Sequence, residues 1–194
     1  QLLDNLNVLN HFGRPVQIVA VAGKDDELYE QLQAVEWHVP AHIYNFVTNM
    51  PEFMLAADAI ICKAGGLVVT ESLAAGLPML LVDVIPGQEE GNRDYAVKNG
   101  AADMIESPMD MLETMAHLMA DGGALLKQRA RNARQLGRPN SALDVAEMVW
   151  RSALRGPVSK QGRFGQGRRL LIDLLTRYNI PWRENQPSEK HEHE

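Results

Sequence analysis

The stretch of sequence that decides the fold spans residues 59–92 and reads AIICKAGGLVVTESLAAGLPMLLVDVIPGQEEGN. It opens with a short apolar run, residues 59–62, that is typical of a buried strand, and the pair Gly65-Gly66 interrupts that run. Apolar residues then recur at helical spacing as far as Gly76, and a second apolar run covers residues 79–82. This order predicts a strand, a glycine turn, a helix and a second buried strand.

The glycine turn is suited to an anion. A turn that leads into a helix N-terminus offers unpaired backbone N–H groups and the positive end of the helix dipole, which favour a phosphate or a diphosphate. Glu71 lies on the second turn of the expected helix, where its carboxylate can reach the hydroxyl groups of a sugar attached to that phosphate. The fingerprint G-x-G-x-x-G and the Walker sequence are both absent, so neither NAD nor a P-loop nucleotide is favoured. From these residues alone, a plain turn followed by a solvated Glu71 is the alternative.

A second polar loop, residues 86–92, leaves the next expected strand. Because ligands of open parallel sheets bind where the carboxyl ends of neighbouring strands meet, this loop is expected beside the glycine turn. Gln88, Glu89 and Asn92 supply donors and acceptors that suit sugar hydroxyl groups. The two loops together predict a two-part site for a sugar nucleotide.

The rest of the chain continues the alternation of strands and helices, which predicts an α/β fold with a parallel sheet flanked by helices. The other expected strands are residues 16–22, 42–46 and 102–105. The other expected helices are residues 25–35, 51–57, 93–99, 108–120, 124–136 and 142–154, the last capped by Ser141. We therefore expect one domain over residues 1–155.

Composition limits the class of protein. With 194 residues, 45% of them apolar, the chain can bury a sizeable core. A net charge of −6 argues against a general nucleic-acid binder. The single cysteine, Cys62, excludes a disulfide framework, and the histidines lack the spacing of a metal site. No apolar run approaches the roughly 20 residues of a membrane span.

These motifs resemble the C-terminal, donor-binding half of the GT-B glycosyltransferases of family 28, and among them the monogalactosyl- and glucosyl-diacylglycerol synthases most. The residues that carry the resemblance are Lys63-Ala64-Gly65-Gly66, Thr70-Glu71, Gly76-Leu77-Pro78, Pro86-Gly87-Gln88-Glu89 and Gly91-Asn92. The sequence Pro-Gly-Gln-Glu is the specific part, since the peptidoglycan glucosaminyltransferase of the family is similar only through the glycine turn and the glutamate. The resemblance covers residues 16–150, about two-thirds of the chain.

The resemblance implies a Rossmann-like domain that binds a UDP-sugar, with a role for each matching residue. The residues implied are Phe46 and Val47 for uracil, Glu71 for the ribose, the backbone of Gly65, Gly66 and Leu67 for the diphosphate, and Gln88, Glu89 and Asn92 for the hexose. From the sequence alone, Phe46 and Val47 are equally well interpreted as core residues.

The implied reaction is the inverting transfer of a hexose from a UDP-sugar to a diacylglycerol-type lipid, without a metal or another cofactor. In such relatives the general base and the lipid site belong to the N-terminal domain, so we expect no catalytic residue in this chain and no transfer by residues 1–194 alone. The alternatives are a peptidoglycan-type UDP-N-acetylglucosamine transferase, a sugar-nucleotide epimerase of the same architecture, and a donor subunit that needs a partner chain.

The composition changes beyond residue 155. Residues 156–169 are basic and rich in glycine, residues 170–175 suggest a short amphipathic helix, and the end of the chain is polar. A basic stretch beside such a helix suits an anionic membrane surface, although such helices more often pack on their own domain. We expect a cytoplasmic protein, with peripheral contact at the inner face of the plasma membrane as the membrane-bound alternative.

Overall fold

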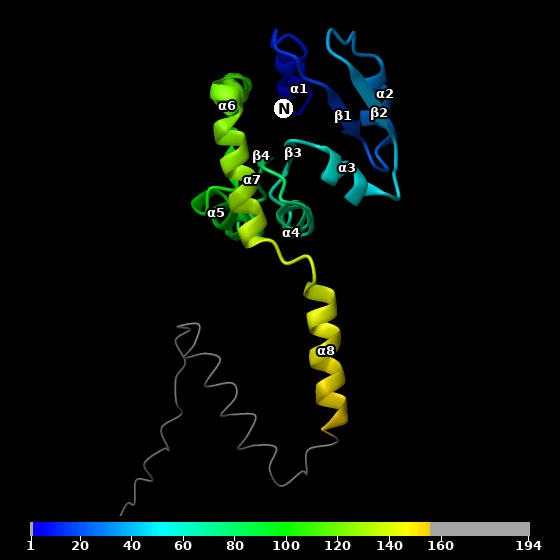
Figure 1. Cartoon of the computed structure of the whole chain (residues 1–194). Coiled ribbons are helices and arrows are strands. Elements are labelled where there is room, and N and C mark those ends of the chain that lie inside the picture. Colours follow the sequence, from blue (N-terminus) through cyan, green and yellow to red (C-terminus); the bar gives the residue numbers. More distant parts are fainter. Residues whose placement is uncertain (1, 156–194) are drawn as a thin grey trace, which may run out of the picture. The chain divides into compact units, whose positions relative to one another are not determined.

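The computed structural model describes residues 2–155 (Figure 1). The chain divides into two units between Ser141 and Ala142. The first unit holds all the strands of the described residues. The second contains the rest of helix α8 (Ser141–Leu154). The predicted linker and amphipathic helix, residues 156–175, lie outside the described residues, and the domain boundary predicted at residue 155 stays a prediction.

All strand pairs in the described chain are parallel, as the alternation of elements predicts. The strands are β1 (Ile18–Val21), β2 (Ala41–Tyr44), β3 (Ile60–Lys63), β4 (Met79–Asp83) and β5 (Ala102–Met104). Instead of one sheet they form two, with the strand orders β1-β2 and β3-β4-β5. Ile60 pairs with Met79 and Met79 with Ala102, so β4 lies between its two neighbours. The carboxyl ends of β3 and β4 therefore lie side by side.

Helices connect the strands and cover the sheets. They are α1 (Leu2–Asn10), α2 (Asp26–Gln33), α3 (Met50–Ala56), α4 (Gly66–Ala75), α5 (Glu90–Lys98), α6 (Pro108–Met119), the short 3₁₀ helix η1 (Ala120–Gly122) and α7 (Ala124–Leu136). Figure 1 follows the alternation along the colour ramp from β1 in blue to α6 and α7 in green.

Local chemistry explains where several helices begin and end. Asp25 accepts a hydrogen bond of 2.9 Å from the backbone N–H of Leu28 and so caps α2. Ser107 caps α6 in the same way, and Pro108 occupies its first turn, where no N–H is needed. Gly76 ends α4 in the left-handed conformation (φ 71°), as its place after the apolar run predicts. The sequence signals for starts and stops are thus satisfied at these positions.

Strand β4 is the centre of the core because its side chains alternate between two hydrophobic clusters. Leu80 and Val82 belong to a cluster with α1, α2, α6 and strand β1. Met79 and Leu81 belong to a second cluster with α4, α5 and α7. Each of these four side chains is less than 10% exposed. Helices therefore cover both faces of the three-stranded sheet, which is the arrangement that parallel sheets require.

Helix α8 carries an internal ion pair between Arg151 and Glu147, one turn apart. No helix among residues 2–155 is both long enough and apolar enough to cross a membrane.

Candidate functional site

The glycine turn lies at the carboxyl end of β3 and opens helix α4. Gly65 is the N-cap residue, with an extended backbone (φ −63°, ψ 140°), and no side chain caps the helix. The backbone N–H groups at the start of α4 are therefore left without a side-chain partner, as donors at a helix N-terminus are. Neither Gly65 nor Gly66 has a positive φ. The backbone conformation thus does not require glycine here, and close approach by another group is the better explanation.

The second loop follows β4 and turns tightly into α5. The Glu89 carboxylate accepts a hydrogen bond of 2.9 Å from the backbone N–H of Ile85, which closes the loop on itself. Helix α5 begins at Glu90, earlier than the predicted residue 93, so Asn92 lies in its first turn. Gln88 is exposed at the tip of the loop, and its side chain makes no hydrogen bond within the part of the chain that the structure describes.

The structure brings the two loops together. A Cβ atom at Gly65 would lie 3.5 Å from Glu89 Oε1, and one at Gly66 would lie 3.5 Å from Asn92 Nδ2. The Asn92 amide also donates a hydrogen bond of 3.0 Å to the carbonyl of Ala64. Glu89 and Asn92 therefore lie directly over the glycine turn, as the parallel pairing of β3 and β4 predicts.

Glu71 and Leu67 are exposed on α4, and Leu67 is 74% exposed. No protein group bonds to the Glu71 carboxylate in the described chain, so it is free to accept hydrogen bonds from a ligand. The ligand roles of these residues remain predictions.

Charges border the site without entering it. Lys63 and Asp83, at the ends of β3 and β4, form an ion pair of 3.1 Å, and both side chains are about half exposed or more, so the pair adds little stability. Hydrogen bonds from Lys98 and Arg93 lower the pKa of the Asp94 carboxyl on α5.

Cys62 of β3 is chemically inert at neutral pH. Burial raises the pKa of its thiol to about 12. The thiolate, which is the reactive form, is therefore absent at neutral pH.

The predicted uracil residues lie in another part of the first unit. Phe46 and Val47 follow the carboxyl end of β2, in the two-stranded sheet, whereas the glycine turn follows β3 of the three-stranded sheet. Phe46 is 61% exposed, which rules out its interpretation as a core residue. Its ring lies 5.5 Å from Lys24 Nζ, a cation–π distance. Sequence reasoning missed Lys24, because a cation beside an aromatic ring leaves no fixed spacing in the sequence.

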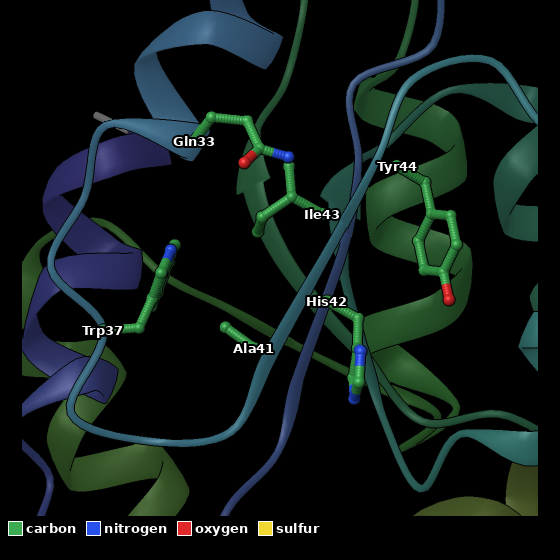
Figure 2. Close-up of a pocket in the computed structure, with 6 residues that line it drawn as sticks. All are labelled: Gln33, Trp37, Ala41, His42, Ile43 and Tyr44. Carbon is green, nitrogen blue, oxygen red and sulfur yellow. The ribbon is translucent and has the colours of Figure 1, made fainter.

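A pocket of about 360 Å³ lies on strand β2, away from the two loops (Figure 2). Its lining residues are Gln33, Trp37, Ala41, His42, Ile43 and Tyr44. Figure 2 shows His42 and Tyr44 on one side of the strand and Trp37 on the other, and the indole N–H of Trp37 is already bonded to the carbonyl of Leu32. Because its polar groups do not converge, the chemistry favours the glycine turn as the functional site.

Among residues 2–155 there is no group of three or more histidine, cysteine, aspartate or glutamate side chains that could hold a metal ion.

Comparison with known proteins gives consistent results. The model of the glycosyltransferase family 28 C-terminal domain matches residues 1–142. The chain is 36% identical over 144 residues to monogalactosyldiacylglycerol synthase 2, chloroplastic, of Arabidopsis thaliana, covering 74% of this chain and 31% of that protein. It is 38% identical over 136 residues to a probable monogalactosyldiacylglycerol synthase, chloroplastic, of Glycine max, covering 70% of this chain and 26% of that protein. The chain thus spans less than a third of the length of these two relatives.

The crystal structure of MurG from Acinetobacter baumannii is similar in fold. Its TM-score is 0.56 at 22% identity, and the likeness covers 76% of this chain and 53% of that one. The predicted fold, an α/β domain of the GT-B glycosyltransferases, is confirmed.

Proposed function

Because the chain belongs to glycosyltransferase family 28 by its match to the C-terminal domain, we propose that its first unit is the donor-binding part of an enzyme that transfers galactose from UDP-galactose to diacylglycerol. One observation carries the proposal: Glu89 and Asn92 lie over an uncapped glycine turn at the adjoining ends of β3 and β4. The choice of galactose and of diacylglycerol is supported by the relatives, which are named as monogalactosyldiacylglycerol synthases.

The diphosphate is assigned to the backbone N–H groups of Gly66 and Leu67 at the start of α4. These donors have no side-chain cap to compete with the ligand. The absence of a side chain at Gly65 and Gly66 lets the phosphate oxygens approach them. As the bond between the sugar and the diphosphate breaks, negative charge grows on the leaving UDP, and fixed donors at this position stabilise it.

The hexose is assigned to the second loop. The Glu89 carboxylate would repel a phosphate, so it is better suited to accept hydrogen bonds from sugar hydroxyl groups. The Asn92 amide uses one N–H on the carbonyl of Ala64 and keeps a second N–H and its oxygen for the ligand. Gln88, exposed at the tip of the loop, extends the same polar surface. One of these groups would read the axial or equatorial hydroxyl that separates galactose from glucose.

Glu71 is assigned to the ribose hydroxyls, and Phe46 and Val47 to the uracil. The assignment of Glu71 is supported by its exposed, unbonded carboxylate one turn beyond the diphosphate donors. The assignment of Phe46 and Val47 to the uracil rests on the family resemblance alone.

No metal or other cofactor is proposed for the reaction, and the displacement inverts the configuration at the anomeric carbon. The acceptor is a membrane lipid, so the proposed reaction takes place at a membrane surface. The lipid site and the base are proposed to lie outside residues 1–194, and transfer by these residues alone is not expected.

The test is calorimetric titration of UDP-galactose and UDP-glucose into the 194-residue chain. We expect binding of UDP-galactose, and a loss of at least about tenfold in affinity for Glu71→Ala, since one charged hydrogen-bonding group contributes about 1.5–3 kcal/mol. Glu113→Ala, which removes an exposed glutamate from α6, is the matched control and should bind as the wild type does. Equal affinities of the wild type and Glu71→Ala would remove the ribose role, and no binding of either nucleotide would overturn the proposed function.

A further inference from the structure

The loop after β1 and the loop after β2 lie side by side at one edge of the two-stranded sheet. The two strands are parallel, and Val21 at the carboxyl end of β1 pairs with Tyr44 at the carboxyl end of β2. Gly23 turns the chain with a φ of 70° and so places Lys24 between β1 and helix α2. Phe46 leaves β2 at the same edge. The sheet therefore brings Lys24 and Phe46 together from two separate loops.

Two contacts join these loops. The Lys24 Nζ atom lies 5.5 Å from the centroid of the Phe46 ring. The Asn45 amide donates a hydrogen bond of 3.3 Å to the carboxylate of Asp26, the first residue of α2. The start of α2 is thus tied to the residue that precedes Phe46, and the ammonium group of Lys24 stays beside the ring.

The Lys24 ammonium group keeps its hydrogen-bond donors for a ligand. Lys24 is exposed, and within residues 2–155 its side chain forms neither an ion pair nor a hydrogen bond. The three acidic residues that follow it in the sequence each accept a hydrogen bond from another residue; they are Asp25, Asp26 and Glu27. An ammonium group carries three N–H donors and no acceptor, so all three donors of Lys24 are available.

The Phe46 ring offers an apolar surface next to these donors. It is 61% exposed, so most of the ring is open to a ligand. A ring beside an available cation suits a ligand with a flat apolar face and a hydrogen-bond acceptor at its edge. Nucleobases combine these two features, because they stack on aromatic side chains and carry polar groups around the ring.

The chemistry of the cation distinguishes between the pyrimidine bases. An ammonium group only donates hydrogen bonds, so it needs an acceptor on the edge of the base. Uracil has a carbonyl oxygen at C4, whereas cytosine has an amino group there, which is itself a donor. Two donors that face each other leave both groups unpaired, and a site built to bond one group rejects the analogue that lacks it.

We propose that Lys24 is a specificity residue of the donor site. Its ammonium group donates a hydrogen bond to the C4 carbonyl oxygen of uracil and so distinguishes a UDP-sugar from a CDP-sugar. The inference rests on the proposed function, which assigns the uracil to Phe46 and Val47. Lys24 touches the base alone and takes no part in the transfer of the sugar.

The experiment titrates UDP and CDP separately into the 194-residue chain by calorimetry. We expect the wild type to bind UDP at least about tenfold more tightly than CDP. Lys24→Met removes the ammonium group and keeps an unbranched side chain, so it should weaken UDP about tenfold or more without weakening CDP. The preference for UDP is then lost. Lys24→Arg keeps a charged donor and should retain most of the preference.

Two control variants separate the base from the rest of the nucleotide. Lys127→Met removes one lysine from α7 and should leave both affinities unchanged. Lys127 shares a cavity with Asp58 and Pro78, which precede β3 and β4, whereas the glycine turn follows β3. Glu71→Ala acts on the ribose, which UDP and CDP have in common, so it should weaken both by the same factor and leave their ratio unchanged.

Each part of the proposal has an outcome that contradicts it. Equal losses of UDP and CDP affinity in Lys24→Met would indicate a contact to a group that both nucleotides carry and would overturn the reading of C4. Unchanged affinities in Lys24→Met, or equal affinities of the wild type for UDP and CDP, would overturn the role of Lys24 and leave the donor function intact. Absence of binding of either nucleotide to the wild type would overturn both the proposed function and this inference. Circular dichroism checks that each variant is folded.

Discussion

The two glycines that flank α4 have different structural roles: Gly65 is its N-cap and Gly76 its C-cap. Gly76 has a φ of 71° and lies under Arg134, so any side chain there is strained. Gly65 has an ordinary φ, and a Cβ atom there would meet Glu89 and Val68 at normal contact distances of 3.5 and 3.6 Å. The fold requires glycine at position 76, whereas glycine at position 65 is explained by the space that the absent side chain leaves above the turn.

Alanine at each position should separate these roles. Gly76→Ala is expected to lower the free energy of unfolding by about 1–2 kcal/mol, the cost of a left-handed residue. Gly65→Ala should leave that free energy unchanged or raise it by up to about 1 kcal/mol, yet weaken UDP binding, because the methyl group narrows the approach to the proposed diphosphate donors of Gly66 and Leu67. Urea unfolding and UDP calorimetry measure the two effects. Normal UDP binding by Gly65→Ala would count against the diphosphate assignment.

The Cys62 thiol makes stability depend on pH in the alkaline range. Its pKa rises from 9.0 to about 12 on folding, so the unfolded chain ionises first. The contribution is fully present below pH 9.0 and is lost as the pH rises toward about 12. Between about pH 8 and pH 10 the wild type should lose about 1 kcal/mol more unfolding free energy than Cys62→Ala. Urea unfolding at both pH values measures this, and parallel losses in the two proteins would refute it.

At the scale of the element, the cap of α2 is a local source of stability. Asp25→Ala removes the carboxylate that accepts from Leu28 N–H and should cost about 1 kcal/mol. Glu30→Ala removes the same charge from the exposed side of α2 without removing a cap, so it should cost much less. Thermal unfolding compares the two variants, and equal losses would show that charge, rather than capping, stabilises the helix.

The sequence predicted the elements well because each one carries its own signals. Helix α7 has the predicted bounds, and α4 ends at the predicted glycine. The start of α5 was predicted three residues late, because the hydrogen bond from Ile85 N–H to Glu89 shortens the loop and no periodicity reveals it. The split of the strands into two sheets depends on which backbone edges meet, and side-chain patterns do not encode that choice.

The candidate site was predictable where two consecutive strands pair. The positions of Glu89 and Asn92 over the turn follow from the parallel register of β3 and β4. The contact between Lys24 and Phe46 joins the ends of β1 and β2 and was not predicted, because a cation–π pair leaves no fixed spacing in the sequence.

At the scale of the molecule, the two faces of β4 pack into different hydrophobic clusters. Leu80 packs in the cluster that includes β1 and α6, whereas Leu81 packs in the cluster of α4, α5 and α7. Either change to alanine should cost about 2–5 kcal/mol, since both side chains are fully buried.

The two variants should differ in where the structure opens. Leu80→Ala is expected to speed amide hydrogen exchange in β1 and β2, and Leu81→Ala to speed it first in α4 and α5. The variants are matched in size and differ by one position in the chain. Identical exchange patterns would show that the first unit unfolds only as a whole.

The ten-residue helix α4 is held at both ends, by Asn92 over Gly66 and by Arg134 over Gly76. With both ends held, the helix has a fixed length and phase, because each added residue rotates one end relative to the other by roughly 100°. Insertions and deletions inside α4 would rotate the glycine turn relative to the second loop, and would move the apolar residues of the helix away from the core. The length of this helix, more than the identity of its exposed residues, should therefore be the quantity that evolution holds constant.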